Sequence, residues 1–295
     1  MREIKFDIKP KVRRLDLFTR KGISGALTGA YRTSFRGKGM EFSDFRRYTP
    51  HDDANMIDWK TSLKAQQLMI KEYEEERNIN VIFLVDVSST MSFTSTTRLK
   101  NEYVAEIVSS LSFALLQAGD NAGIVMFSDK INHHVLPSGG NRQYYMILEA
   151  LSDPKNYEGK KDFGKAINFL MSYLKDRAVV IVISDFIGME EDWHLALTTA
   201  MAKFEMIGIM VRDPRDNVMP EGSGHVVLSD PFSKTQKVID PYFIGKRYAN
   251  IAKMQKNEVF AEFAKIDSDI IELTTDKGFM HPILRLFKKR ERRMR

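Results

Sequence analysis

The chain has 295 residues, of which 43% are apolar and 28% charged, a composition typical of an ordinary globular protein. It contains no cysteine, which excludes disulfides, zinc–thiolate sites and cysteine nucleophiles. The net charge of +6 arises entirely from residues 285–295, so the other 284 residues are neutral overall and lack the basic bias of a nucleic-acid-binding body.

Residues 1–75 form the first predicted segment, which is charged, punctuated by glycine and poor in apolar runs. Its start breaks its apolar residues with charges, unlike the continuous apolar stretch of a secretory signal. The longest apolar runs of the chain, 81–85 and 178–183, are far shorter than the ~20 residues that a membrane-spanning helix needs. We therefore expect a cytoplasmic protein that neither spans a membrane nor is secreted.

From residue 79 onward, short runs rich in Ile and Val alternate with segments of helical periodicity. Strands that alternate with helices of this length predict parallel βαβ units. We therefore predict an α/β fold with a doubly wound, mostly parallel sheet over a domain of residues 76–280. The predicted strands are 79–86, 122–127, 178–185, 206–211 and 269–273, with 131–136 as an antiparallel edge and 225–228 and 237–239 as a hairpin. The predicted helices are 98–118, 142–151, 162–174, 190–204 and 244–266.

Polar side chains occupy alternate positions at the end of the first of these strands. Asp86, Ser88 and Thr90 lie there, and a second carboxylate, Asp185, ends the strand 178–185. Ligands of such sheets bind at the carboxyl ends of the strands. Because carboxylate and hydroxyl oxygens suit Mg²⁺, Mn²⁺ or Ca²⁺, we predict a divalent-metal site at these four residues. The alternative is that the motif serves only as a turn and an N-cap.

The run from Phe83 to Met91 resembles the metal-ion-dependent adhesion site of von Willebrand factor A (VWA) domains, Asp-x-Ser-x-Ser, with Thr90 at the last hydroxyl position. The resemblance covers residues 79–275 and implies an ion whose open position captures an acidic side chain of a partner protein. VWA domains usually offer a further Thr ligand where this chain has Lys161. Because an ammonium cannot be a ligand, three alternatives stay open: Asp162 substitutes for it, the metal binds weakly, or no metal binds.

A second pattern, Gly-x-Gly-x-Glu-Phe-x-Asp-x-Arg-x-Tyr, runs from Gly37 to Tyr48 and is followed by Ile-Asp-Trp at 57–59. It resembles the signature of a bacterial VWA-containing family, domain of unknown function 58, whose members are often encoded beside MoxR-type AAA+ ATPases. The resemblance implies such an ATPase as the partner. A Gly-Asp-Asp common in that family is His51-Asp52-Asp53 here, while Asp213 and Asp230 match its pattern.

This second pattern mixes charges with aromatic rings, and two readings of it stay open. One is a small salt-bridged subdomain fixed to the VWA body, and the other is a surface that docks a partner. A metal site at residues 51–53 is disfavoured because adjacent residues rarely converge on one ion. The candidate docking residues are Glu41, Asp44, Arg46, Tyr48, Asp52, Asp53 and Trp59.

Residues 281–295 are predicted to be a basic tail, for which three readings stay open. In the first, the tail is a solvated helix end. In the second, it docks on an acidic partner protein or makes a peripheral contact with anionic lipid head groups. In the third, it contacts nucleic-acid phosphates. The chain shows no recognition motif for nucleic acid, so we expect no specific nucleic-acid partner.

The sequence thus predicts a non-enzymatic adaptor that binds a protein through its metal site and works with a MoxR-type ATPase in protein maturation or stress response. The alternative is a metal-dependent phosphohydrolase that uses the same strand-end carboxylates. A dehalogenase-type phosphatase, however, needs a carboxylate as general acid–base at the position of Ser88, and serine cannot serve at neutral pH.

Overall fold

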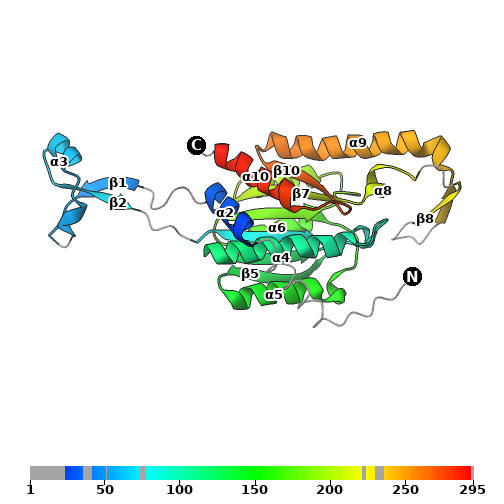
Figure 1. Ribbon diagram of the computed structural model, residues 1–295, viewed down its shortest axis with the longest axis horizontal. Helices are drawn as coiled ribbons and strands as arrows, with labels where there is room; N and C mark the ends of the chain where they lie inside the picture. The colour runs from blue at the N-terminus through cyan, green and yellow to red at the C-terminus, as the bar shows by residue number, and fades with distance from the viewer. Residues whose placement is uncertain are drawn as a thin grey trace.

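The computed structural model describes residues 24–35, 42–50, 52–73, 78–220, 224–229 and 236–293. At its centre is a six-stranded sheet in the order β10-β7-β6-β3-β4-β5 (Figure 1). All neighbouring strands in it are parallel except β4 and β5. Counted along the chain this is the doubly wound order 3-2-1-4-5-6, which reverses direction between β3 and β6. The strands are β3 (Asn80–Asp86), β4 (Asn121–Phe127), β5 (Ile131–Ser138), β6 (Ala178–Ser184), β7 (Phe204–Arg212) and β10 (Asp269–Thr274).

The central strands have the sequences that burial on both faces requires. β6 reads Ala-Val-Val-Ile-Val-Ile-Ser and is buried along its whole length, and β3 is buried from Val81 onward. β-Branched side chains pack well on a pleated surface, and parallel strands covered on both sides form continuous apolar runs. The predicted α/β class with a doubly wound, mostly parallel sheet is confirmed.

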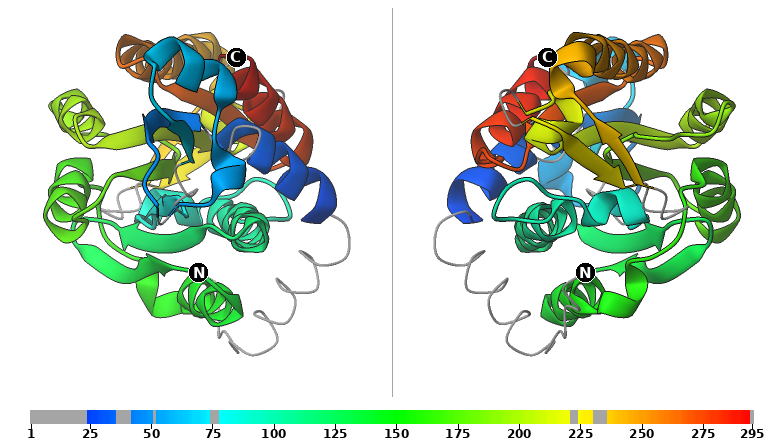
Figure 2. Two further views of the ribbon diagram at one scale, coloured as in Figure 1. Left: turned by 90° about the vertical axis from the view of Figure 1, so that its left-hand side faces the viewer. Right: turned by 90° about the vertical axis from the view of Figure 1, so that its right-hand side faces the viewer.

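Helices cover both faces of this sheet (Figure 2). The core on one face includes side chains of α2, α4, α5 and α10, and the core on the other includes side chains of α6, α7 and α9. No helix in the described ranges is long and apolar enough to cross a membrane. The helices are α2 (Ser24–Phe35), α4 (Lys100–Ala118), α5 (Asn141–Ser152), α6 (Phe163–Tyr173), α7 (Trp193–Met201), α9 (Pro241–Lys265) and α10 (Met280–Arg293).

Short elements complete the connections between these strands and helices. The predicted hairpin is present as the antiparallel pair β8 (Val226–Ser229) and β9 (Gln236–Ile239). Three short helices are η2 (Ser89–Ser92), η3 (Pro154–Asn156) and α8 (Pro214–Asn217). Of these, η2 and α8 follow β3 and β7, so both lie at the carboxyl edge of the sheet.

The segment predicted as a basic tail is largely a packed helix. α10 buries Ile283, Leu286 and Phe287. The Tyr31 ring of α2 meets the Phe287 ring edge-on, with 6.1 Å between centroids, and the Ser34 hydroxyl donates to the Phe287 carbonyl at 2.5 Å. Residues 280–293 are therefore part of the globular body, contrary to the expectation of a separate tail at 281–295.

Basic side chains of α10 form ion pairs with acidic residues of the sheet. Lys289 Nζ lies 2.8 Å from Asp269 Oδ1, and Arg290 Nη1 lies 3.4 Å from Asp269 Oδ2, at the start of β10. Arg290 also pairs with Glu205, and its side chain is buried. The basic character of this segment thus neutralises acidic groups on the neighbouring strands, which a solvated helix end would not do.

A β-hairpin arm of residues 42–73 stands clear of the sheet layers at one end of the molecule (Figure 1). In it β1 (Phe42–Arg47) pairs antiparallel with β2 (Met69–Tyr73), and η1 (Ala54–Met56) and α3 (Trp59–Ala65) lie between them. None of the described arm residues belongs to the cores on the two faces of the sheet. The predicted segment 1–75 therefore contains two different parts: α2 packs in the core of the body, and the arm extends away from the body.

Candidate functional site

The candidate site lies at the carboxyl ends of β3 and β6, where the strand order of the sheet reverses. Asp86 is the last residue of β3 and Asp185 directly follows β6, and the two strands pair in register with Val85 opposite Ile183. Adjacent parallel strands end at the same edge, so the fold brings the two carboxylates together. Both side chains are fully buried.

The ammonium group of Lys161 lies between these two carboxylates. Its Nζ is 2.8 Å from Asp86 Oδ2 and 2.5 Å from Asp185 Oδ1, and it donates to the carbonyl of Ile187 at 3.0 Å. An ammonium has three protons, and these three contacts use all of them. The Lys161 side chain is 2% exposed, so these ion pairs are shielded from water and from salt.

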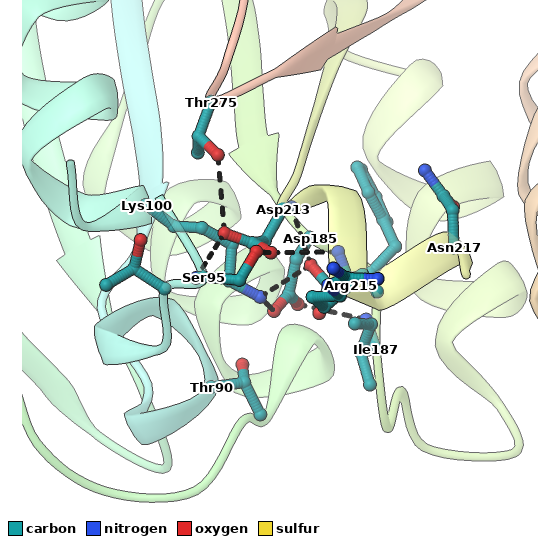
Figure 3. A network of polar contacts seen from close by, with 12 residues as sticks. Thr90, Ser95, Lys100, Asp185, Ile187, Asp213, Arg215, Asn217 and Thr275 are labelled. Carbon is teal, nitrogen blue, oxygen red and sulfur yellow. Dashed lines mark hydrogen bonds and ion pairs between the residues drawn. The ribbon is translucent and has the colours of Figure 1, made fainter. Parts of the chain in front are cut away.

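A second buried lysine comes from the first turn of α4. Lys100 Nζ lies 2.8 Å from Asp185 Oδ2 and 3.0 Å from Asp216 Oδ2, and its side chain is 1% exposed (Figure 3). Asp185 therefore joins two lysines, with one carboxylate oxygen for each. Asp216, in α8, also accepts the backbone N–H of Asp213 at 2.8 Å, which connects the network to the end of β7.

Asp213 ties three connections of the sheet edge to one another (Figure 3). Its carboxylate accepts the Ser95 N–H at 2.8 Å and the Ser95 hydroxyl, both from the loop before α4. It also accepts the Arg215 N–H at 2.9 Å and the Thr275 hydroxyl at 3.4 Å. The loops that follow β3, β7 and β10 are consequently held in one hydrogen-bonded arrangement.

The loop that carries Lys161 is fixed on both sides of the lysine. The Gly159 carbonyl accepts both the N–H of Ser89, at 3.0 Å, and its hydroxyl, at 3.1 Å, while the Asp162 N–H donates to the Ser128 carbonyl at 3.0 Å. Gly159 has a φ of 103°, and a Cβ there would lie 2.5 Å from Asp129 Oδ1. Glycine is required at this position because its backbone conformation and its close contacts both exclude a side chain.

The turn after β6 is strained and aims two backbone groups at the site. Phe186 has a φ of 51°, which is rare for a bulky residue, and its ring is buried against Trp193 and Phe263. The next residue, Ile187, donates its N–H to Asp185 Oδ1 at 3.0 Å and offers its carbonyl to Lys161. The packing of the Phe186 ring thus holds a backbone conformation that orients both charged partners.

The charges of this network stabilise one another. Burial alone would lower the pKa of Lys161, but the carboxylates of Asp185 and Asp86 outweigh it and hold that pKa above its ordinary value. Burial would likewise raise the pKa of Asp185, but Lys161 and Lys100 hold it well below the ordinary carboxyl range. Asp185 and Lys161 therefore form a charged pair at neutral pH.

Hydrogen bonds within the site occupy the other predicted ligands. The Ser88 N–H donates to Asp86 Oδ1 at 2.9 Å, and the Ser88 hydroxyl lies 3.1 Å from the Thr90 hydroxyl. In Figure 3, Thr90 lies apart from the network around Asp185. Asp162 serves as the N-cap of α6, where it accepts the Lys165 N–H at 2.8 Å.

These residues do not fit a resident divalent cation. An ion bonded to both Asp86 and Asp185 at about 2.0–2.1 Å, the usual Mg–O distance, would need the place held by the Lys161 ammonium. An ion about 4 Å from that ammonium would be repelled by roughly 8 kcal/mol at an effective dielectric constant of about 20. Within the described residues, no group of three or more His, Cys, Asp or Glu side chains is arranged to hold a metal ion. The predicted metal site thus lacks support from the geometry.

Among the predicted docking residues in the arm, Arg46 and Asp52 form a bidentate pair. The Arg46 nitrogens donate to the two Asp52 oxygens at 2.7 and 2.6 Å, and the Thr49 N–H donates to Asp52 Oδ2 at 2.8 Å. These hydrogen bonds hold the pKa of Asp52 well below its ordinary value. Asp53 caps η1 by accepting the Asn55 N–H.

The remaining predicted docking residues differ in their exposure and in whether the structure describes them. Trp59, at the start of α3, is 65% exposed, whereas Tyr48 is half-buried. Asp44 lies in β1. Glu41 lies outside the described residues, as do His51 and Asp230.

Lys100, Ser184 and Asp216 belong to the site but are absent from the sequence-based prediction. Ser184 donates its hydroxyl to Asp86 Oδ2 at 2.6 Å. For Lys100 a signal exists, since it lies three residues before Tyr103 and seven before Ile107 on the buried face of the helix. A lysine on a buried helical face requires a charged partner.

Comparison with known proteins places the chain among uncharacterised bacterial relatives. The uncharacterised protein Rv1480 of Mycobacterium tuberculosis is 25% identical over 285 residues, which cover 95% of this chain and 89% of that protein. The uncharacterised protein YeaD of Bacillus subtilis is 28% identical over 126 residues, 41% of this chain and 30% of that one.

One solved structure shares the fold at low identity. The conserved hypothetical protein BatB from Bacteroides thetaiotaomicron superposes with a TM-score of 0.51 at 17% identity, and the match covers 73% of this chain and all of that one. A von Willebrand factor type A structure from Catenulispora acidiphila has a TM-score of 0.41 at 9% identity, over 76% of this chain and 44% of that one.

The family described as "Protein of unknown function DUF58" matches residues 44–258, a span that begins within β1 and includes the rest of the β1–β2 arm and all of the sheet except β10. On this match, the chain belongs to the DUF58 family.

Proposed function

We propose that this protein is a non-enzymatic adaptor that binds a partner protein through its arm, and that the partner is a MoxR-type AAA+ ATPase. The observation that carries the proposal is the exposed apolar face of α3. Trp59 is 65% exposed and Leu63 is 81% exposed. They are four residues apart on one helix, so they lie on the same face.

The surroundings of these two residues fit a docking element. Aromatic anchors surrounded by charged groups are typical of the energetic centres of interfaces. Lys60 and Lys64 are exposed on the same helix, which favours an acidic rim on the partner. The bidentate Arg46–Asp52 pair holds the turn after β1 in place, so the arm is partly organised before it binds.

The VWA-like α/β fold suggests a protein-interaction domain, and the DUF58 resemblance implies the ATPase as the interacting protein. Capture of an acidic side chain by a metal ion is not part of this proposal because Lys161 lies where the ion was expected. The phosphohydrolase alternative needs an ion at the same place, and no observation favours it.

Binding of the purified ATPase to arm variants tests this proposal. Trp59→Ala and Leu63→Ala should each weaken binding by about thirtyfold, since a buried interface anchor is worth about 2 kcal/mol. Tyr242→Ala is the matched control, because Tyr242 is 88% exposed on α9, outside the arm. Treating this chain with chelator and removing the chelator before the ATPase is added should leave all affinities unchanged.

Failure of the wild type to bind the ATPase would contradict the proposed partner. Equal binding by the wild type and both arm variants would contradict the proposed surface. Turnover of a phosphoester that stops in Asp86→Asn would contradict the non-enzymatic assignment.

A further inference from the structure

We propose that the Lys161 ammonium takes the place of a divalent cation, so that the strand-end site is complete and closed without metal. This inference concerns the site at β3 and β6 and does not depend on the arm or on its partner. Its first support is position. One nitrogen atom lies 2.8 and 2.5 Å from the carboxylates of the two strands, the same pair from which a bridging cation would be held.

The second support is that every carboxylate oxygen of the pair already has a partner. Asp86 Oδ1 accepts from the Ser88 N–H, and Asp86 Oδ2 contacts Lys161 and accepts from Ser184. Asp185 Oδ1 contacts Lys161 and accepts from Ile187, and Asp185 Oδ2 contacts Lys100. A cation that bridged the two carboxylates from between them would have to displace the Lys161 ammonium.

The third support is charge. Lys161 and Lys100 together bring two positive charges, as many as one divalent ion would supply, to a buried edge that holds Asp86, Asp185 and Asp216. Buried carboxylates need such compensation, because an unpaired buried charge is strongly destabilising.

The fourth support is preorganisation of the lysine. The Gly159 carbonyl is bonded to Ser89, and the Asp162 N–H is bonded to Ser128, so the backbone on both sides of Lys161 is held. The buried side chain then ends on three acceptors. A lysine that only lay near the site by chance would extend its ammonium into water, as long basic side chains usually do.

This arrangement has a consequence for binding at the carboxyl edge. A metal-filled site offers an open coordination position to an acidic group, whereas an ammonium with three contacts offers none. Removing the ammonium and supplying a neutral hydroxyl should therefore turn the same residues into a cation site, since hydroxyl and carboxylate oxygens suit Mg²⁺ and Mn²⁺.

Metal titration of the full chain and two variants tests the proposal. Lys161→Thr removes the ammonium, and Lys160→Thr is the matched control because Lys160 is the exposed neighbour. Calorimetry with Mn²⁺ and Mg²⁺ should show no saturable binding in the wild type or in Lys160→Thr. Lys161→Thr should bind the ion with a Kd at least tenfold below the highest ion concentration at which the wild type shows no binding. Its melting temperature should rise by roughly 5–10 °C at an ion concentration of about a hundred times that Kd.

Two results of the metal titration would overturn the proposal. One is saturable binding of Mn²⁺ by the wild type that is lost in Asp86→Asn. The other is a folded Lys161→Thr, verified by circular dichroism, that gains no affinity for either ion.

A measurement on the wild type alone covers the case in which the variant does not fold. With ¹⁵N-labelled lysine, the ammonium signals of Lys100 and Lys161 should exchange slowly and stay sharp during a Mn²⁺ titration, and paramagnetic broadening of them would overturn the proposal.

Discussion

Replacing Lys161 with methionine isolates what the ammonium contributes to stability. The substitution keeps an unbranched side chain of similar length but leaves Asp86 and Asp185 buried without the charge between them. Removing one partner of a buried ion pair costs about 3–5 kcal/mol. Asp185 keeps Lys100, so the loss should fall near the lower end, at about 3 kcal/mol, which corresponds to a fall in melting temperature of roughly 6–12 °C.

Urea unfolding of a double-mutant cycle measures this energy. Lys161→Met, Asp86→Asn and the double variant are compared with the wild type, and the amide oxygen introduced by Asp86→Asn can still accept a hydrogen bond from Ser88 or Ser184. The double variant should be more stable than the sum of the two single losses predicts, by about 1–3 kcal/mol. Lys160→Met, at the exposed neighbour, should change stability by less than about 0.5 kcal/mol. A loss of that small size in Lys161→Met, or simple additivity in the cycle, would refute the reasoning.

Three other predictions concern pH and packing. The Asp185 pKa is lowered from 3.8, so its contribution is present above that value and is lost in acid. The Lys161 pKa is raised from 10.5, so its contribution is present below that value and is lost in strong base. The stability difference between wild type and Lys161→Met should therefore be flat across neutral pH, and a slope centred near pH 7 in urea titrations would contradict this. Gly159→Ala should lower the free energy of unfolding by about 1–3 kcal/mol, because the new Cβ clashes and the φ is positive. The loss should exceed that of Gly188→Ala, where a Cβ meets nothing within 4 Å. Equal losses in urea unfolding would contradict the steric explanation. Arg290→Ala should lower the melting temperature by several degrees because it leaves Asp269 less compensated, and an unchanged value by calorimetry would mean that the Arg290–Asp269 pair is not needed for stability.

The alternation of apolar runs and helical segments was enough to predict the sheet. The β6 run of Ala, Val and Ile is unbroken because the strand is buried on both faces. In a chain where such runs alternate with helical segments, the run indicates a central strand of a parallel sheet. The positions of Asp86 and Asp185 at the ends of two strands then predicted that these carboxylates would meet. Local pattern suffices to find the end of each strand, and the rule that parallel strands of one sheet end at the same edge then brings the two carboxylates together.

What fills the site could not be read from the same pattern. Lys161 stands out in the sequence only as a residue that opposes a cation, and its contacts with Asp86 and Asp185 depend on three loops that meet in space. The basic residues of α10 pose the same difficulty. Their charge alone left a solvated helix end, a docking segment and a phosphate contact all open. Ion pairs with Asp269 in β10 and Glu205 in β7 decide the place of Lys289 and Arg290, and both partners are distant from them in sequence.

Anomalous diffraction from wild-type crystals soaked in Mn²⁺ shows whether an ammonium group or a metal ion lies between the two strand-end carboxylates. We expect electron density for the Lys161 ammonium between Asp86 and Asp185, within hydrogen-bonding distance of both, and no anomalous peak at that position. A manganese peak bonded to the two carboxylates, with the Lys161 side chain turned away from them, would contradict this expectation.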